Sequence, residues 1–285
     1  MMKPSLMIGC IAGFFLFFWA FMLGSNYPGI MANSLEFLKN TDNSNKNNVQ
    51  PQDECSCALP PSKVDAIGGW VYSKETIQNH HTRFDDGMGK EIVRLVLKNT
   101  PKKENGKKPT IGDIGAGVGQ FGAWLNSKGE KSVEWTGFDG GSNVNSFCGK
   151  NVSLQNNDVI KVPKVCYLDA SIPVNLENFD ALGAPFDWVV SIEVGEHIPA
   201  EYMMIYIDNL IRLSKYGIII SWAVVGQGGH GHVNTRSNED IIQKMVDRSL
   251  VYLPKESEAV RSRIDRLDWL RHTAMVFGKV DGMDA

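Results

Sequence analysis

The chain has 285 residues, of which 43% are hydrophobic and 21% are charged. This composition argues against a solenoid, a collagen-like chain and a wholly disordered chain, and the length allows one large domain with additional segments. Lys and Arg number 29 against 32 Asp and Glu, which gives a net charge of -3 and no overall attraction to a nucleic-acid backbone. We therefore expect no nucleic-acid partner.

The N-terminal part of the chain holds an uncharged, strongly apolar run at residues 6–23. In a helix with a rise of about 1.5 Å per residue the run spans roughly 27 Å, close to the thickness of a hydrocarbon core. Lys3 precedes the run and no Lys or Arg follows until Lys39, so residues 1–5 are expected to form a cytoplasmic tail. The sequence predicts a transmembrane signal anchor, with a long cleavable signal peptide and a buried core helix as the alternatives.

Residues 24–61 have a different composition. Few patterned apolar residues occur after Leu38, and asparagines are crowded between positions 40 and 48, so this segment cannot bury enough apolar surface to offset the entropy of ordering. We expect a flexible stem here and a globular domain at 62–285. The layout resembles that of type II membrane enzymes of the eukaryotic secretory pathway, which implies a single-pass protein of the endoplasmic reticulum or Golgi membrane.

The cysteine pattern is compatible with an oxidising compartment. Cys10 lies inside the predicted anchor, and four cysteines remain, which allow three disulfide connectivities: Cys55, Cys57, Cys148 and Cys166. We expect the stem cysteines to pair with the domain cysteines. A zinc site is less favoured, because one residue separates the first two and no second close pair follows. The triplet at 151–153 is a glycosylation acceptor sequence.

The most informative region begins at Pro109. An apolar strand pattern ends at Asp113, three alternating glycines follow, and a helical pattern runs through Leu125; the glycines are Gly115, Gly117 and Gly119. Such a turn lets the backbone approach a ligand closely and leads into a helix whose first amides are unpaired. The sequence therefore predicts a nucleotide-binding strand, turn and helix.

The motif Asp113-x-Gly115-x-Gly117-x-Gly119 resembles the first motif of class I S-adenosylmethionine-dependent methyltransferases. The resemblance implies an α/β fold with a Rossmann-like seven-stranded sheet, helices on both faces and an antiparallel seventh strand. It also implies S-adenosyl-L-methionine as the cofactor, with Asp113 helping to hold its methionine end. The helical segment 75–97 matches the N-terminal helix that often covers the cofactor in this family; a solvent-facing amphipathic helix is the alternative.

Carboxylates follow successive predicted strands. Strand patterns at 134–138, 165–168 and 188–192 end at Asp139, Asp169 and Glu193, and a fifth strand pattern covers 216–222. The carboxyl ends of parallel strands meet along one edge of a sheet, where ligands bind, so these side chains should converge. Each one alone is better explained as a solvated loop carboxylate, but their ordered occurrence at successive strand ends favours a site.

The resemblance assigns a role to each of these positions. Asp139 matches the acidic residue that accepts hydrogen bonds from the ribose hydroxyls. Asp169 with Ala170 matches the pair beside the adenine, and Glu193 matches the position near the methionine moiety.

Three histidines follow the fourth and fifth strands. His197 stands in a Glu-His-Ile sequence similar to one found in many small-molecule methyltransferases, and Pro199 is expected to start the next helix. His230 and His232 lie in a polar, glycine-rich loop at 226–234. Any of the three is a candidate general base, because the ordinary imidazole pKa is about 6.5. His197 is equally explained as a helix cap, and the His230–His232 pair as ligands of a divalent ion; we assign no metal ligand.

The C-terminal part supplies further helices at 237–247 and 255–270 and apolar segments at 250–253 and 273–277, which fit the last two strands of the sheet. The loop at 221–234 and the helix at 237–246 also look similar to a group of uncharacterised animal methyltransferase-domain proteins. That similarity names no substrate.

The sequence thus predicts methyl transfer to an acceptor held about 3 Å from the sulfonium methyl, with catalysis by positioning and proton removal. The expected compartment suggests a hydroxyl of a glycan, a glycoconjugate or another small-molecule acceptor. Two alternatives remain open. One is an NAD(P)-dependent Rossmann oxidoreductase or epimerase, against which the glycine spacing and the lack of a Tyr-x-x-x-Lys pair argue; the other is a catalytically silent scaffold of the same fold.

Overall fold

The computed structural model describes residues 55–57 and 66–279. The predicted tail at 1–5, the predicted anchor at 6–23 and most of the predicted stem lie outside the described residues. Within the part of the chain that is described, no helix is both long and apolar enough to cross a membrane.

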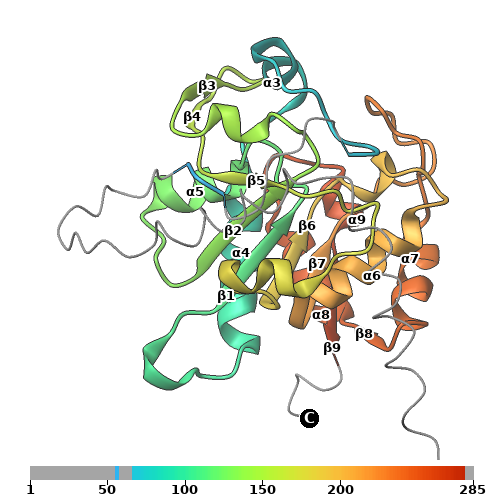
Figure 1. Cartoon of the computed structure of the whole chain (residues 1–285). Helices are drawn as coiled ribbons and strands as arrows, with labels where there is room; N and C mark the ends of the chain where they lie inside the picture. The colour runs from blue at the N-terminus through green and yellow to red at the C-terminus, as the bar shows by residue number, and fades with distance from the viewer. Residues whose placement is uncertain (1–54, 58–65, 280–285) are drawn as a thin grey trace, which may run out of the picture. The chain divides into compact units, whose positions relative to one another are not determined.

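The domain is built on a seven-stranded sheet (Figure 1). The strands are β1 (Thr110–Ile114), β2 (Glu134–Asp139), β5 (Val165–Tyr167), β6 (Phe186–Ser191), β7 (Ser214–Ile220), β8 (Leu250–Tyr252) and β9 (Met275–Lys279). Their order is β5-β2-β1-β6-β7-β9-β8, with β9 antiparallel to both neighbours and every other pair parallel. The predicted seven-stranded α/β sheet with an antiparallel last strand is confirmed.

The central position of β1 brings the predicted carboxylates together. Asp113 pairs in register with Gly137 on β2 and with Val190 on β6. Three neighbouring strands therefore end side by side, and the residues that follow them share one edge of the sheet.

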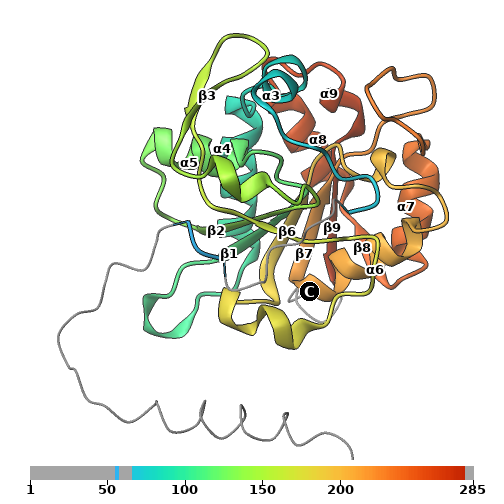
Figure 2. The same cartoon turned by 45° about the horizontal axis from the view of Figure 1, so that its top comes forward.

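Helices cover both faces, as predicted (Figures 1 and 2). They are α3 (Lys74–His80), α4 (Asp86–Asn99), α5 (Gln120–Lys128), α6 (Met203–Leu213), α7 (Asn238–Val246), α8 (Pro254–Arg263) and α9 (Leu270–Thr273). Alternate residues of one strand face opposite cores because side chains in a strand alternate in direction. On β7, Ile218 and Ile220 pack in the core that includes α6 and α7, and Ile219 packs in the core that includes α4, α5 and α8.

The single helix predicted at 75–97 is wrong, since α3 and α4 are separate. The break arises at Asp85, whose buried carboxylate caps α4 by accepting from the Met88 amide at 3.0 Å. The same carboxylate accepts from the amides of Asp265 and Arg266. This tertiary anchoring fixes residues 81–85 in an extended path between the two helices.

Three other helix and strand boundaries differ from those predicted. Pro199 precedes a turn and does not start a helix, because the Pro199 carbonyl accepts from the Tyr202 amide and α6 begins at Met203. The charged run predicted as a helix at 255–270 is helical only to Arg263, where α8 ends, and residues 264–269 separate it from α9, which begins at Leu270. The last strand begins at Met275, after Thr273 has closed α9.

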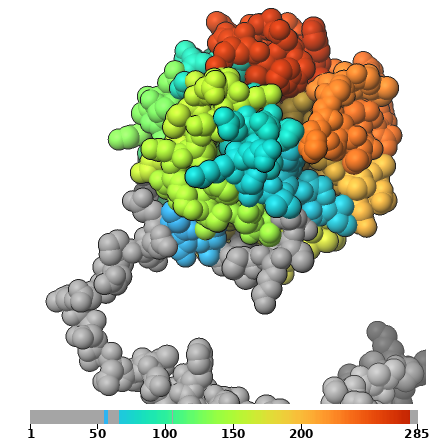
Figure 3. Space-filling view, turned by 90° about the horizontal axis from the view of Figure 1, so that it is seen from above, coloured from blue at the N-terminus to red at the C-terminus, as the bar shows by residue number. Residues whose placement is uncertain are grey.

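Two short features cover the carboxyl edge of the sheet. A hairpin of β3 (Asn151–Ser153) and β4 (Val159–Lys161) was not predicted. Residues 66–72, which we call the strap, are tied to the domain by a hydrogen bond from the Ala66 amide to the Gly140 carbonyl at 2.8 Å. In Figure 3 the cyan chain that includes the strap lies between the yellow-green region of the hairpin and the orange loop near residue 230.

Two disulfides join the predicted stem to the domain. Cys55 bonds to Cys148 and Cys57 to Cys166, across sequence separations of 93 and 109 residues. Cys166 is buried in β5, so the second bridge attaches the N-terminal segment directly to the sheet. The expected pairing of stem cysteines with domain cysteines is confirmed.

Removing either bridge should lower the stability of the domain, because loops of this length lose much unfolded-state entropy when closed. We expect Cys55→Ser/Cys148→Ser and Cys57→Ser/Cys166→Ser each to cost about 2–4 kcal/mol, or roughly 5–15 °C in melting temperature. The measurement is thermal unfolding of the full chain followed by tryptophan fluorescence.

Dithiothreitol should lower the melting temperature of the wild type. It should leave unchanged that of a variant in which all four cysteines are replaced by serine. Equal melting temperatures of wild type and both double variants would contradict the assigned bridges.

Candidate functional site

A cleft of about 440 Å³ opens at the carboxyl edge of β1, β2 and β6. It is lined by nine of the eleven predicted cofactor and catalytic residues, namely Asp113, Gly115, Gly117, Asp139, Ala170, Glu193, His197, His230 and His232. The predicted residues Gly119 and Asp169 do not line it. The convergence expected from the strand ends therefore holds for most of these residues.

The glycine turn after β1 requires glycine for two reasons. All three glycines have positive φ, at 77° for Gly115, 57° for Gly117 and 77° for Gly119, which side chains disfavour. A Cβ on Gly119 would also lie 2.5 Å from the Pro163 ring, so this glycine permits close packing behind the turn rather than contact with a ligand. Gly115 and Gly117 leave the floor of the cleft open.

Asp139 connects the glycine turn, β2 and the strap. Its Oδ2 accepts from the Gly117 amide at 2.9 Å. Its Oδ1 accepts from the Gly141 amide and from the Tyr72 hydroxyl, each at 2.9 Å. The carboxylate is buried, so these hydrogen bonds replace the water that it loses.

Asp113 is buried beneath the cleft and accepts a hydrogen bond from Nε1 of Trp135 at 3.1 Å. Burial, together with the smaller effect of the Asp139 charge, raises the pKa of Asp113 to about 7 against the opposing effect of the Trp135 hydrogen bond. The carboxyl group therefore changes charge near neutral pH.

Asp169 lies beside the cleft but faces away from it. Its Oδ1 accepts from the amide and the hydroxyl of Ser171 at 2.9 and 2.6 Å. Its neighbour Ala170 does line the cleft, and the Ala170 carbonyl accepts from Nδ2 of the buried Asn209 on α6. Of the pair predicted to lie beside a bound adenine, the structure brings Ala170 to the cleft and turns the Asp169 carboxylate to Ser171.

Glu193 is held in a left-handed conformation, with φ of 56°, directly after β6. The Ser221 hydroxyl accepts from the Glu193 amide at 2.8 Å and donates to Oε1 at 2.7 Å, and Gln227 donates to Oε2 at 2.9 Å. Burial raises the pKa of Glu193, and the two donated hydrogen bonds oppose this shift. The side chain is fixed at the wall of the cleft by two donors, and Ser221 also holds the backbone of Glu193.

Five of the six histidines line the cleft, around Trp70 of the strap. The Trp70 ring lies 5.2–5.7 Å from four imidazole rings, those of His80, His81, His197 and His230. His81 contacts Gln120 through Nδ1 at 3.0 Å, and burial followed by the charges of His80 and His197 lowers its pKa to about 4. One end of the cleft is therefore aromatic, and the His81 imidazole within it is neutral at neutral pH.

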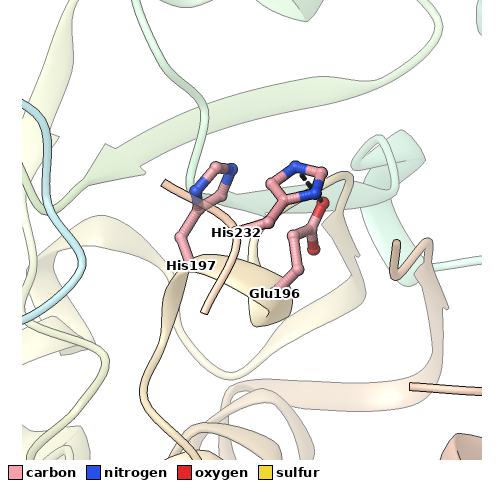
Figure 4. Close-up of side chains that lie close together, drawn as sticks. All are labelled: Glu196, His197 and His232. Carbon is pink, nitrogen blue, oxygen red and sulfur yellow. Dashed lines mark ion pairs between the residues drawn. The ribbon is translucent and has the colours of Figure 1, made fainter. Parts of the chain in front are cut away.

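His197 and His232 lie side by side next to Glu196 (Figure 4). Their ring centroids are 5.1 Å apart, and Nε2 of His232 lies 3.9 Å from Oε1 of Glu196. Burial and then the His232 charge lower the pKa of His197 to about 4. The structure does not group His230 with this pair, because its ring stacks on His80 at a centroid distance of 4.6 Å.

Several residues of the cleft had no assigned role in the sequence. Trp70 and Tyr72 reach it across long separations that no local pattern reveals, Tyr72 being 67 residues from Asp139. Glu196 was visible, since it stands between Glu193 and His197, but its burial depends on the packing of Trp222 against Gly195.

No family model matches the chain, and no curated protein matches it. Solved structures with a similar arrangement include a magnesium protoporphyrin IX methyltransferase (ChlM) from Synechocystis with bound SAM, at 15% identity, 67% of this chain, 77% of that chain and a TM-score of 0.42. An S-adenosylmethionine-dependent methyltransferase from Clostridium acetobutylicum matches at 11% identity, 69% and 92% coverage and a TM-score of 0.45. The [4+2]-cyclase SpnF matches at 12% identity, 77% and 88% coverage and a TM-score of 0.40. These similarities are in the arrangement of helices and strands.

The raised pKa of Asp113 predicts a specific pH dependence of stability. The folded pKa of about 7 exceeds the ordinary value of 3.8, so the contribution of Asp113 to stability is fully present below about pH 4 and is lost as the pH rises through 7. Asp113→Asn keeps the shape and removes the titration. Urea unfolding of both proteins should give free energies whose difference favours the variant increasingly from about pH 4 to about pH 8.

The expected change in that difference is on the order of a few kcal/mol. Parallel pH profiles of the two proteins would contradict the raised pKa.

Proposed function

We propose that the chain is an S-adenosylmethionine-dependent methyltransferase that acts on a hydroxyl group of a small or glycan acceptor. The observation that carries the proposal is the pairing of Asp139 with the Gly117 amide, which sets an acidic strand end against a glycine turn across one cleft. The resemblance of the Asp-x-Gly-x-Gly-x-Gly motif gives this pairing its interpretation as a site for ribose and methionine.

The cleft fits such a cofactor in shape and in charge. A Cβ on Gly117 would lie 2.7 Å from the Gln120 side chain and 3.2 Å from His81, so any other residue would displace two side chains that line the cleft. Carboxyl groups line the same floor and wall, from Asp113, Asp139 and Glu193. They favour a ligand with an ammonium and a sulfonium group over one with a pyrophosphate. This charge pattern supports the methyltransferase proposal over the NAD(P)-dependent alternative.

Each part of the cleft has a role in this proposal. Asp139 would hold the ribose hydroxyls, sharing its Oδ1 with Tyr72 or replacing that hydrogen bond, and Glu193 and Asp113 would hold the methionine end. When bound, the cofactor supplies an electrophilic methyl group on sulfur. The chain's own task is to hold the acceptor oxygen in line with that methyl and to exclude water. Trp70 of the strap lines the cleft and is our candidate for the second role.

Proton removal completes the reaction. The acceptor oxygen forms a bond to the methyl carbon, the carbon–sulfur bond breaks with its electron pair on sulfur, and the acceptor proton must leave. We propose that an imidazole of the group His197, His230 and His232 accepts it. The aromatic end of the cleft, with Trp70 among the imidazoles, suits an acceptor with one apolar face and one hydroxylated face, as a sugar ring has.

We further propose that the domain lies on the lumenal side of a secretory-pathway membrane, with residues 6–23 as its anchor. The two disulfides support this compartment, because such bonds persist in oxidising surroundings.

Cofactor binding tests the proposed function directly. Calorimetry on the full chain in detergent should give micromolar binding of S-adenosylmethionine and S-adenosylhomocysteine. Asp139→Asn should weaken this binding at least tenfold, because a charge-assisted hydrogen bond is worth about 1.5–3 kcal/mol. Asp169→Asn is the matched control at the neighbouring strand end, and we expect less than a threefold change because Asp169 faces Ser171.

Binding of NAD or NADP in place of both methyl-cycle ligands would replace the proposal with the oxidoreductase alternative. Binding of none of these ligands would favour a catalytically silent scaffold.

Glycosylation tests the proposed compartment. Asn151 is exposed at the start of β3 and is therefore accessible to modification. Endoglycosidase treatment of the chain made in animal cells should increase its gel mobility, and Asn151→Gln should abolish that shift. Complete digestion of the domain by protease added to sealed microsomes would place it on the cytosolic side and contradict the proposal.

A further inference from the structure

Glu196 is a buried carboxylate with little compensation for its burial. Its side chain has no exposed surface, and among the described residues neither of its carboxylate oxygens has a hydrogen-bond partner of normal geometry. The amides of Glu196 and Ala223 favour the charged form, but they only partly oppose burial and the Glu193 charge, which raise the pKa of Glu196 well above its ordinary value. Buried carboxylates in proteins are paired, hydrogen-bonded or bound to a metal, since the cost of leaving water is otherwise uncompensated. The arrangement of Glu196 is that of an acidic ligand whose partner has yet to bind.

The backbone around Glu196 holds this carboxylate next to the glycine-rich loop. A Cβ on Gly195 would lie 2.2 Å from the Trp222 ring, so glycine allows the preceding residue to pack closely there. The Glu196 carbonyl accepts from the amides of Val233 and Asn234 at 2.8 and 3.0 Å. The loop that carries His232 is thus attached to Glu196 itself.

Two imidazoles face the same point. Nδ1 of His197 lies 3.2 Å from the Gly231 carbonyl, and Nδ1 of His232 lies 3.3 Å from the Gln227 carbonyl. A carbonyl oxygen accepts a hydrogen bond, so Nδ1 of each ring carries a proton and the neutral form of each ring has its lone pair on Nε2. Ligating histidines in metal sites commonly show this second hydrogen bond to a backbone carbonyl.

We propose that Glu196, His197 and His232 bind one divalent transition-metal ion of the Zn²⁺ type at the acceptor end of the cleft. One ligand atom from each residue lies within 4.8 Å of the other two. Two imidazoles and one carboxylate form a ligand set that Zn²⁺ uses in catalytic sites, where a fourth position stays open, whereas Mg²⁺ and Ca²⁺ prefer oxygen ligands.

Closing the site needs only a small movement. Ligand atoms at about 2.1 Å from a tetrahedral ion lie about 3.4 Å from one another. Separations of up to 4.8 Å between the three ligand atoms must therefore shorten by no more than about 1.4 Å. His232 is on a loop with positive φ at Gly226 and Gly231, at 89° and 74°, and can make this adjustment by rotation about its side-chain bonds.

The position of the ion gives it a role in the proposed reaction, although its binding does not depend on that reaction. Both imidazoles line the cleft, so the open coordination position faces the space available to an acceptor. An oxygen bound there is more acidic and is held in a fixed place. His197 and His232 would then be ligands, and His230 is the member of the candidate group that stays free to accept a proton.

Metal titration of the full chain tests this proposal. After treatment with EDTA and its removal, calorimetry with Zn²⁺ should show one ion per chain with micromolar or tighter affinity, and Co²⁺ should give the visible absorption of a tetrahedral site. Saturating Zn²⁺ should raise the melting temperature by roughly 5 °C, because the ion binds the folded chain alone.

Two variants separate this site from other ways of binding the ion. Glu196→Gln keeps the shape of the side chain and removes its charge, and His232→Ala removes the ligand on the glycine-rich loop. Each should weaken Zn²⁺ binding at least tenfold. His272→Ala removes the histidine outside the cleft and should leave the affinity within twofold.

Other outcomes overturn the assignment. Unchanged affinity in a folded Glu196→Gln variant, or loss of binding in His230→Ala, would exclude the proposed ligand set and favour the pair His230 and His232. Absence of Zn²⁺ and Co²⁺ binding to the folded wild type would exclude the site altogether. Cofactor binding measured in parallel without metal shows whether the methyltransferase proposal stands independently of these results.

Discussion

The carboxylate of Asp139 is the contact on which the arrangement of the cleft depends. One side chain at the end of β2 accepts from the glycine turn after β1, from its own loop at Gly141 and from the strap through Tyr72. Three segments that are distant in sequence are thereby held in place by one buried carboxylate. Because an unsatisfied buried carboxylate is costly, loss of any of these donors destabilises the positions of the other two. The floor, the wall and the cover of the cleft are coupled through this group.

A concentration of buried carboxyl groups is the main electrostatic feature of the domain. Burial raises the pKa of Asp113 and Glu193, and burial with the neighbouring Glu193 charge raises the pKa of Glu196 well above its ordinary value. Hydrogen bonds offset only part of the free-energy cost of burying these carboxyl groups. Trp135 donates to Asp113, and Ser221 and Gln227 donate to Glu193. Positively charged ligands would offset the remaining cost of burial. The domain is therefore less stable without such ligands, and the loss of stability arises where ligands are proposed to bind.

The sheet could be predicted from sequence because each of its strands is a short apolar segment with a clear end. Asp113, Asp139 and Glu193 were found for the same reason, since a residue that follows a parallel strand must lie at the binding edge. The orientation of Asp169 could not be predicted, because it depends on the local hydrogen bonds of Ser171. The strap has no such local signal, as its place is determined by Tyr72 and Ala66 contacting β2 and Gly140. The break before α4 had a visible cap in Asp85, but a continuous apolar pattern on both sides concealed it.

The bridge between Cys57 and Cys166 also limits how far the strap can travel. Eight residues lie between Cys57 and Ala66, and the nine Cα–Cα steps that join them reach at most about 30 Å when fully extended. If the strap leaves the cleft to admit a ligand, this bridge keeps it covalently attached to β5 through a short linker. Rebinding of the strap is then intramolecular and occurs at a high effective concentration. Reduction of this bond would lengthen the linker and change the rate of rebinding, so access to the cleft would depend on the redox state of the compartment.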